Sequence, residues 1–297
     1  MNEIGAQSLA GLNTHAKTLK NIQLYVQQDS LSALDTLQDC IALTHVSLEA
    51  PHSIMNLDWE ITYPGVFEAV VGWLQKCTAM LYLDINCLPS APSLLANVLK
   101  VPEIRLVSLT VIMLHRTDTF ADGLACQNLL QTLALATFEE SVDADEPGHI
   151  HLMNAVAECT QLRRLWLKSE LLSTADVHSL TGTAQLLEEF RFNGDMLGDD
   201  NLMTLARFRY LKDVNILGTS FFTHDALHSF IRGLASHPNA SVAHAGMSLF
   251  ITQHGEGKFS KAEETELEQE MWEKFRGRID IGYVADPDED HESDFSD

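Results

Sequence analysis

The side chains of this sequence that could bind a metal ion lie in two places. His224 and His228 are four residues apart, so on a helix both imidazole rings would lie on one face, as in many zinc sites. The sequence places no third ligand beside them, and we interpret them as a pair on the protein surface. The second place is a stretch of acidic residues and histidines: Asp143, Asp145, Glu146, His149 and His151. Its spacing fits neither an EF-hand loop nor a zinc template, so we predict no metal ion and no cofactor.

The sequence contains none of the common motifs for covalent catalysis or phosphoryl transfer. No G-x-S-x-G, H-E-x-x-H or G-x-x-x-x-G-K-[S/T] motif occurs, and residues 255–258 (Gly-Glu-Gly-Lys) are too few for a phosphate-binding loop. The five cysteines are widely spaced without a C-x-x-C pair, which argues against a disulfide framework and indicates a reducing compartment. We predict that the chain has no catalytic residues and is not an enzyme.

The composition narrows the set of partners. Among 297 residues, 19 Lys and Arg stand against 42 Asp and Glu, a formal net charge of −23. Phosphate binding depends on lysine and arginine, so we expect neither nucleic acid nor an anionic membrane as the main partner. No run approaches the roughly 18 apolar residues of a membrane span, and residues 1–11 do not resemble a signal peptide. We expect a cytoplasmic or nuclear protein that acts as a monomer.

A single hydrophobic pattern, L-x-x-L-x-L, recurs along the chain. Its eight matches are Leu19/Ile22/Leu24, Leu43/Val46/Leu48, Met80/Leu83/Ile85, Ile104/Val107/Leu109, Leu130/Leu133/Leu135, Leu162/Leu165/Leu167, Leu187/Phe190/Phe192 and Leu211/Val214/Ile216. Their first positions are 24, 37, 24, 26, 32, 25 and 24 residues apart, so five of the seven steps lie within two residues of 24. A period of about 20–29 residues is typical of leucine-rich repeats. The abundance of leucine, 43 residues, follows from this repeat.

The repeat predicts both kinds of secondary structure. Each match alternates like a short strand whose fourth and sixth residues face inward. Segments between matches have apolar residues spaced as on a helix with one buried face; examples are Leu31/Leu34/Leu37 and Leu202/Leu205/Ala206. One such unit cannot cover its own apolar face, so neighbours must stack. We therefore predict an α/β fold: a leucine-rich-repeat solenoid (horseshoe) of about eight to nine strand–helix repeats, with a parallel concave sheet and a C-terminal helix–strand cap.

The chain divides into three predicted segments. Residues 1–257 form the solenoid. Residues 258–285 form the cap, because a capping box begins a helix at Ser260, Gly277 ends it, and an alternating strand pattern follows. Residues 286–297 are acidic and are expected to be disordered.

Two long steps of the repeat indicate insertions. They are residues 51–63, which carry Trp59 and Tyr63, and residues 139–149. Insertions in a solenoid emerge as loops and are often used for binding. We expect both segments to be loops.

Four cysteines lie just before matches of the repeat, where a helix gives way to a strand. They are Cys40, Cys77, Cys126 and Cys159. A thiol is small and weakly polar, so we expect these side chains to fill tight buried corners as structural thiols.

One unit, Leu187–Leu205, matches the repeat consensus through its strand (Phe190, Phe192), turn (Asp195) and helix. It resembles the ribonuclease-inhibitor-like branch of the leucine-rich-repeat superfamily, over roughly residues 5–250. The irregular repeats, the insertions and the acidic tail resemble most the leucine-rich-repeat portion of F-box proteins from filamentous fungi, although we find no F-box. This resemblance implies a module that recognises substrates for an SCF-type ubiquitin ligase, without the ligase-docking part. The alternative is a regulator of an enzyme, such as a GTPase activator or enzyme inhibitor of the same fold class.

Residues at the fifth position of the pattern point away from the core and form one row across the predicted sheet. The row is Gln23, Ser47, Asp84, Ser108, Ala134, Trp166, Arg191 and Asn215. Trp166 would stand exposed beside Arg191, within reach of a cation–π contact. The alternative is that Trp166 merely covers the sheet beside a loop.

Tryptophan and arginine dominate the hot spots of protein interfaces, so we predict that a protein partner binds the concave face around Trp166. The predicted binding residues are Trp166, Arg163, Arg164, Lys168, Arg191, Arg105 and Tyr82. Tyr82, together with Tyr25, forms a weaker second cluster. The sequence does not identify the partner.

Overall fold

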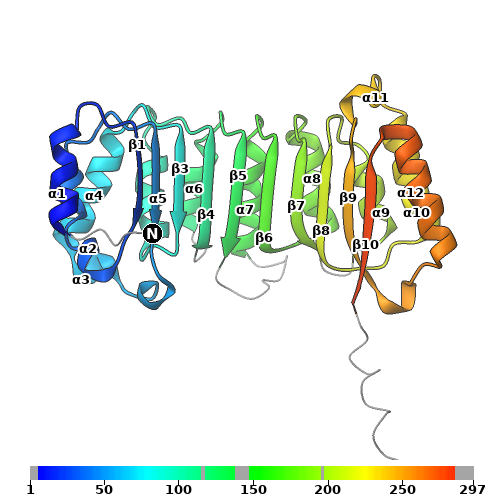
Figure 1. The fold of residues 1–297 in the computed structure, drawn as a ribbon, viewed down its shortest axis with the longest axis horizontal. Helices are drawn as coiled ribbons and strands as arrows, with labels where there is room; N and C mark the ends of the chain where they lie inside the picture. The colour runs from blue at the N-terminus through cyan, green and yellow to red at the C-terminus, as the bar shows by residue number, and fades with distance from the viewer. Residues whose placement is uncertain (1–5, 115–117, 138–146, 195–196, 285–297) are drawn as a thin grey trace, which may run out of the picture. The chain divides into compact units, whose positions relative to one another are not determined.

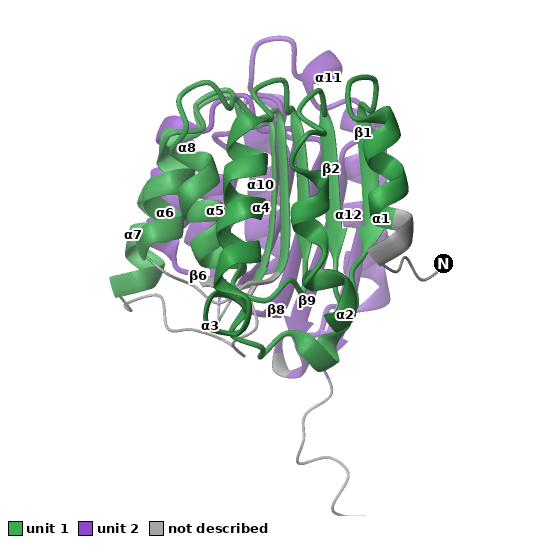
Figure 2. Cartoon of the chain, turned by 90° about the vertical axis from the view of Figure 1, so that its left-hand side faces the viewer, with its two compact units in different colours: residues 1–162 green, residues 163–297 purple. Residues whose placement is uncertain are grey.

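The computed structural model describes residues 6–114, 118–137, 147–194 and 197–284. The chain forms two compact units, Met1–Leu162 (unit 1) and Arg163–Asp297 (unit 2), which Figure 2 colours separately. In each unit, strands alternate with helices along the chain, and the helices cover one face of a parallel sheet (Figure 1). The acidic stretch at 138–146, Asp195 and the tail at 285–297 lie outside the described residues.

The described part of unit 1 contains five parallel strands, adjacent in chain order. They are β1 (Asn21–Tyr25), β2 (His45–Glu49), β3 (Tyr82–Asn86), β4 (Ser108–Leu114) and β5 (Thr132–Thr137). The α-helices are α1 (Ala6–Leu12), α2 (Gln28–Leu31), α3 (Trp59–Thr62), α4 (Pro64–Lys76), α5 (Ala91–Leu99), α6 (Asp118–Ala125) and α7 (Pro147–Glu158). Short 3-10 helices are η1 (Asn13–His15), η2 (Leu34–Leu37) and η3 (His52–Ile54). The single helix expected around Leu31, Leu34 and Leu37 is therefore split between α2 and η2.

The described part of unit 2 also contains five parallel strands in chain order. They are β6 (Arg164–Leu172), β7 (Glu189–Gly194), β8 (Asp213–Ser220), β9 (Ser248–His254) and β10 (Arg278–Val284). The helices are α8 (Thr174–Thr183), α9 (Asp199–Leu205), α10 (His224–Ala235), α11 (Ala240–Ala243), η4 (Gly255–Gly257) and α12 (Lys261–Phe275). In the described ranges, no helix is both long and apolar enough to cross a membrane.

Buried side chains of the strands form layers that continue from one strand to the next. In unit 2, Leu165 pairs with Phe190 and Leu167 with Phe192, and all four side chains are buried. The following strands extend the layers with Val214, Ile216, Leu249 and Ile251. Full burial of one such side chain stabilises the fold by about 1.5–3 kcal/mol. The predicted alternation and the α/β leucine-rich-repeat class are confirmed.

The predicted register of the fourth repeat is wrong by two residues. Strand pairing aligns Leu109 with Leu83 and Val111 with Ile85, so the repeat begins at Leu106 rather than at Ile104. Apolar residues occur in both registers of this segment, and the structure selects the later one, in which Leu106 is fully buried. Thr110 therefore replaces Ser108 in the outward row, and Arg105 precedes strand β4.

The repeat continues beyond the eight matches of the sequence pattern, because β9 is a ninth strand in register with β8. Its L-x-x-L-x-L pattern is hidden because Gly246 stands at the first position. This glycine has a positive φ of 72°, and its N–H donates a hydrogen bond to the carbonyl of Phe275. A side chain would be strained in that conformation.

The C-terminal helix and strand are both present as α12 and β10. The predicted capping box forms, since Ser260 Oγ accepts from the N–H of Glu263 and the Glu263 carboxylate accepts from the N–H of Ser260. In α12, Leu267, Met271 and Phe275 are buried. Trp272 is not, because 54% of its surface is exposed, with the guanidinium of Arg276 5.2 Å from its ring.

The first insertion is not an irregular loop, because it forms the short helices η3 and α3 and buries Trp59 in the core. Trp59 begins α3, is fully buried, and packs edge-on against Phe67 at 5.4 Å between ring centroids. Asp58 caps the helix by accepting a hydrogen bond from the N–H of Ile61 at 3.0 Å. The second insertion ends earlier than predicted, because α7 begins at Pro147 and buries His149.

The corner thiols are confirmed at three of four positions. Cys40, Cys77 and Cys159 are buried, and burial raises the pKa of Cys77 and Cys159 to about 12. Such thiols stay protonated and unreactive at neutral pH. Cys126 is exposed, contrary to the prediction, because the side chain of Gln127 occupies the buried position between helix and strand in this repeat. The Gln127 amide donates to two backbone carbonyls and accepts from one N–H, which satisfies the turn.

Candidate functional site

The sheet face of unit 2 opposite the core carries one row of side chains across five strands. Register places Trp166, Arg191, Asn215, Phe250 and Asp280 side by side, from β6 to β10. We call this row the Trp166 face. Its members alternate with buried core residues along each strand, so they point away from the core. Trp166 itself is 38% exposed.

Trp166 and Arg191 are in direct contact. The guanidinium carbon of Arg191 lies 4.8 Å from the centroid of the Trp166 ring, and Arg191 also donates to a carboxylate oxygen of Asp213 at 3.2 Å. A cation–π contact at an exposed site contributes about 0.5–1 kcal/mol. The guanidinium thus lies between a ring and a carboxylate.

Two polar atoms of this face are buried and have no hydrogen-bond partner among the described residues: Nε of Arg191 and Oδ1 of Asn215. The two residues are cross-strand neighbours. A buried polar atom without a partner costs about 1–3 kcal/mol. One atom is a donor and the other an acceptor, the complement of the C=O and N–H of an amide group. The Trp166 face therefore combines an exposed aromatic ring with an unused donor and acceptor.

The positive charge predicted here is partly neutralised. Arg163 donates to Glu188 at 2.6 Å, and Lys212 approaches the same carboxylate at 3.4 Å. Burial raises the pKa of Glu188, but the hydrogen bonds and charges of Arg163 and Lys212 outweigh it and hold this pKa below its usual range. Arg164 and Lys168 are exposed. The surface around Trp166 is thus mixed in charge and not uniformly basic.

The remaining predicted binding residues belong to unit 1. Tyr82 is 42% exposed on β3 and stacks on the ring of His45, whose Nε2 lies 3.1 Å from Asp84. Arg105 is exposed in the segment before β4. Tyr25, at the end of β1, is only partly exposed. The predicted cluster of Tyr82 and Tyr25 does not form, because Tyr82 aligns with the start of β1 and Tyr25 lies at its end, two strands away.

A cleft of about 1280 Å³ lies near the carboxyl ends of α8, α9 and α10. Its basic lining residues are His178, Arg207, Arg209, Lys212 and His237, and no acidic residue is among the described lining. Basic side chains are favoured at helix carboxyl ends, where they meet unpaired carbonyls and the negative end of the helix dipole. His237 does this directly, with Nε2 2.6 Å from the carbonyl oxygen of Ala206. The helix ends thus account for part of the cleft's charge.

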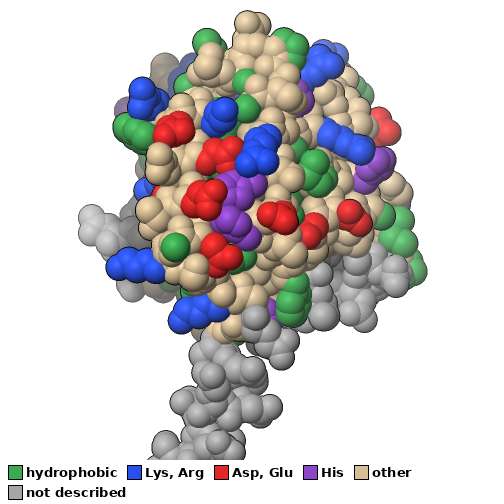
Figure 3. Space-filling view, turned by 90° about the vertical axis from the view of Figure 1, so that its right-hand side faces the viewer, with side chains coloured by type: hydrophobic (Ala, Val, Ile, Leu, Met, Phe, Trp, Pro, Cys, Tyr) green, Lys and Arg blue, Asp and Glu red, His purple; other side chains and the backbone are tan. Residues whose placement is uncertain are grey.

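The interpretation of His224 and His228 as a surface pair is wrong. His228 is buried beneath α12, which brings Glu266 and Glu270 to its two ring nitrogens. The face of unit 2 that carries α10 and α12 is seen in Figure 3, where histidines lie among acidic side chains. Sequence spacing could not reveal this cluster, because the carboxylates follow the histidines by about 40 residues along the chain.

Comparisons with known proteins add little. No protein-family model matches the chain, and no curated protein matches it in sequence. Among solved structures, the chain is similar to a crystal structure of an internalin (inlF) from Listeria monocytogenes. The alignment covers 73% of this chain and 89% of that chain, at 12% identity and a TM-score of 0.33. This similarity carries no information about the function of the chain.

Proposed function

We propose that the chain is a protein-interaction module that binds an extended segment of a protein partner on the Trp166 face. The observation that supports this most directly is the buried, unpaired donor and acceptor at Arg191 and Asn215 beside the exposed ring of Trp166. These atoms have no partner among the described residues, and a small rotation of the two half-buried side chains would let a peptide group of a bound chain supply both.

The size of the face suits a short peptide. Neighbouring strands are about 4.8 Å apart, so the three steps from Trp166 to Phe250 cover about 14 Å. An extended chain advances about 3.4 Å per residue and would place about four residues across that row. An apolar side chain of the partner would pack on Trp166, its backbone amide would pair with Arg191 and Asn215, and a second apolar side chain would reach Phe250.

The chemistry of the partner follows from the surrounding charges. Lys168 and Arg164 are exposed at the Trp166 end, whereas Asp280 is exposed at the opposite end of the row. A partner with an acidic residue near its first apolar side chain and a basic residue near its last would match this distribution.

A finer proposal is that the bound partner is a substrate for a ubiquitin ligase. Its support is the resemblance of the repeats to those of fungal F-box proteins. Copurification of the chain with ligase subunits would support it, and stable capture of a partner without such subunits would contradict it.

Affinity purification of the tagged chain from its native cells, followed by mass spectrometry and direct titration of the purified partner, tests the site. Trp166→Ala combined with Arg191→Ala should abolish capture and leave the thermal midpoint nearly unchanged, because both side chains are partly exposed. Gln23→Ala, at the same position of the repeat in β1, is the matched control and should bind like the wild type. Undiminished capture by the double variant would refute the site. A steep loss of thermal stability would instead show that Trp166 belongs to the core.

A further inference from the structure

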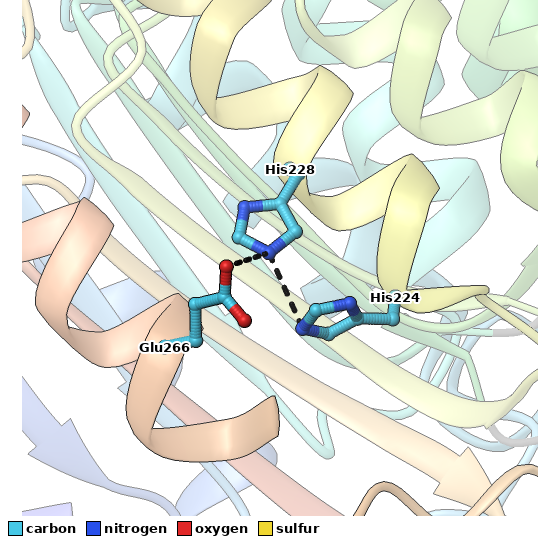
Figure 4. Close-up of side chains that lie close together, drawn as sticks. All are labelled: His224, His228 and Glu266. Carbon is cyan, nitrogen blue, oxygen red and sulfur yellow. Dashed lines mark hydrogen bonds and ion pairs between the residues drawn. The ribbon is translucent and has the colours of Figure 1, made fainter. Parts of the chain in front are cut away.

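His224 and His228 lie on one face of α10, opposite the acidic face of α12. Nε2 of His228 is 3.2 Å from Nε2 of His224 and 3.7 Å from a carboxylate oxygen of Glu266 (Figure 4). All three potential ligand atoms lie within 4.8 Å of one another. His228 is buried, His224 is half-buried and Glu266 is exposed, so the cluster is reachable from solvent on one side.

A second carboxylate orients the imidazole ring of His228. Nδ1 of His228 forms a short hydrogen bond with Glu270, which also accepts from Nε of Arg232 at 3.3 Å. When Glu270 accepts the proton of Nδ1, the lone pair of Nε2 is directed at His224 and Glu266. Histidines that bind metals are held in this way by a carboxylate on the other ring nitrogen.

The spacing of the ligand atoms suits a small transition-metal ion. Two nitrogens bound to zinc at about 2.0–2.1 Å with a tetrahedral angle lie about 3.3 Å apart. The two Nε2 atoms here are 3.2 Å apart. The distance of 3.7 Å to Glu266 is slightly longer, and a small rotation of this exposed side chain would close it. Magnesium and calcium prefer sites made of oxygen ligands, so the two imidazoles favour zinc.

We propose that His224, His228 and Glu266 bind a divalent transition-metal ion, with zinc the best match, and that Glu270 positions His228 from the second coordination sphere. Water completes the coordination as the fourth ligand. The ion joins two helices that pack against each other, α10 within the repeats and α12 at the C-terminal end. It would therefore hold α12 in place. The carboxylates also favour a cation electrostatically, since Glu263 lies close enough to His224 to interact with it.

The purified full-length chain, stripped with a chelator and dialysed, provides the test. Titration with Zn²⁺ at pH 7.5 should show one saturable site per chain by calorimetry and should raise the thermal midpoint by several degrees, because a ligand that binds only the folded state stabilises it. Co²⁺ should give the visible absorption bands of a tetrahedral site. Binding should weaken as the pH is lowered, because protons compete with the metal ion for its ligands.

Single substitutions separate ligation from general charge effects. Glu266→Gln and Glu268→Gln each remove one negative charge from the same helix, and both side chains are exposed. Glu266→Gln and His224→Ala should each weaken Zn²⁺ binding at least tenfold, whereas Glu268→Gln should leave it within about twofold. Equal weakening by both glutamine variants would mean non-specific attraction of cations and would overturn the site. So would a wild type that shows no saturable binding, which would leave the cluster as an ion-pair network of the protein alone.

Discussion

Replacing Asn215 with leucine should stabilise the free protein. Oδ1 of Asn215 is buried and unpaired among the described residues, whereas leucine has the same branching of side-chain heavy atoms and no polar atom to desolvate. An unpaired buried acceptor costs about 1–3 kcal/mol, and we expect the lower end because the residue is only half-buried. The expected gain is therefore about 1 kcal/mol, or a rise of about 2–4 °C in Tm.

Leucine also has a higher strand propensity than asparagine, so a matched substitution is needed. Asn193→Leu on β7 makes the same change at another half-buried position of the sheet. Asn193 differs in having a partner, since its Nδ2 donates to the carbonyl of Lys168 at 2.6 Å. Asn193→Leu therefore loses a hydrogen bond and should gain nothing, while Asn215→Leu should gain. Urea denaturation of both variants measures the difference.

The same substitution should weaken partner binding, because the acceptor for the partner's N–H is gone. A loss of about 1–3 kcal/mol corresponds to a Kd raised about 5- to 150-fold, measurable by calorimetry with the captured partner. Higher stability with weaker binding is the expected signature of a group retained for function. If Asn215→Leu is no more stable than Asn193→Leu, Oδ1 is already satisfied in the free protein, and the reasoning for this site fails.

Three further outcomes test the core and its titrating groups. A thiol reagent at pH 8 should modify Cys126 within minutes and leave Cys159 unmodified in the native protein, because burial raises the pKa of Cys159 to about 12; mass mapping would show the opposite if the corner assignment is wrong. Burial lowers the pKa of His244 below 6.5, so the unfolded state binds the proton more readily. The free energy of unfolding should therefore be highest above that pH and should fall as the pH is lowered. In His244→Gln, where the amide can still donate to the carbonyl of Leu211, the decrease in Tm between about pH 7 and 5 should be smaller. Leu167→Ala should lower the free energy of unfolding by about 2–5 kcal/mol in urea titrations, and a loss below about 1 kcal/mol would contradict its place in the core layer.

Most of the fold could be predicted because the same pattern of apolar residues recurs in every repeat. A strand whose fourth and sixth residues are apolar, such as Leu165 and Leu167, can bury only that face. The prediction failed where the local pattern was ambiguous or interrupted. Around Leu106 two registers are apolar, and pairing with β3 decides between them. At Gly246 the repeat begins with a backbone turn in place of a leucine, so the ninth strand was not visible.

The candidate site was predictable to the extent that it follows from the repeat. Trp166 and Arg191 occupy equivalent positions in consecutive repeats, and equivalent positions become cross-strand neighbours. The cluster at His228 does not follow from the repeat. It depends on how α12 docks against α10, which brings Glu270 to a histidine 42 residues earlier. Tertiary packing of a non-repeating element leaves no periodic signal in the sequence.

The residue types of the outward row differ between the two units. The repeat constrains the core positions equally in both units, but it leaves the fifth position free to vary. In unit 1 these positions hold small or polar residues: Gln23, Ser47, Asp84, Thr110 and Ala134. In unit 2 the same positions hold Trp166, Arg191, Asn215, Phe250 and Asp280. Three of these five are aromatic residues or arginine, the types enriched at interfaces, whereas Ser, Asp and Ala are depleted there. Because neither set is required to build a strand, the difference supports the proposal that a partner binds unit 2.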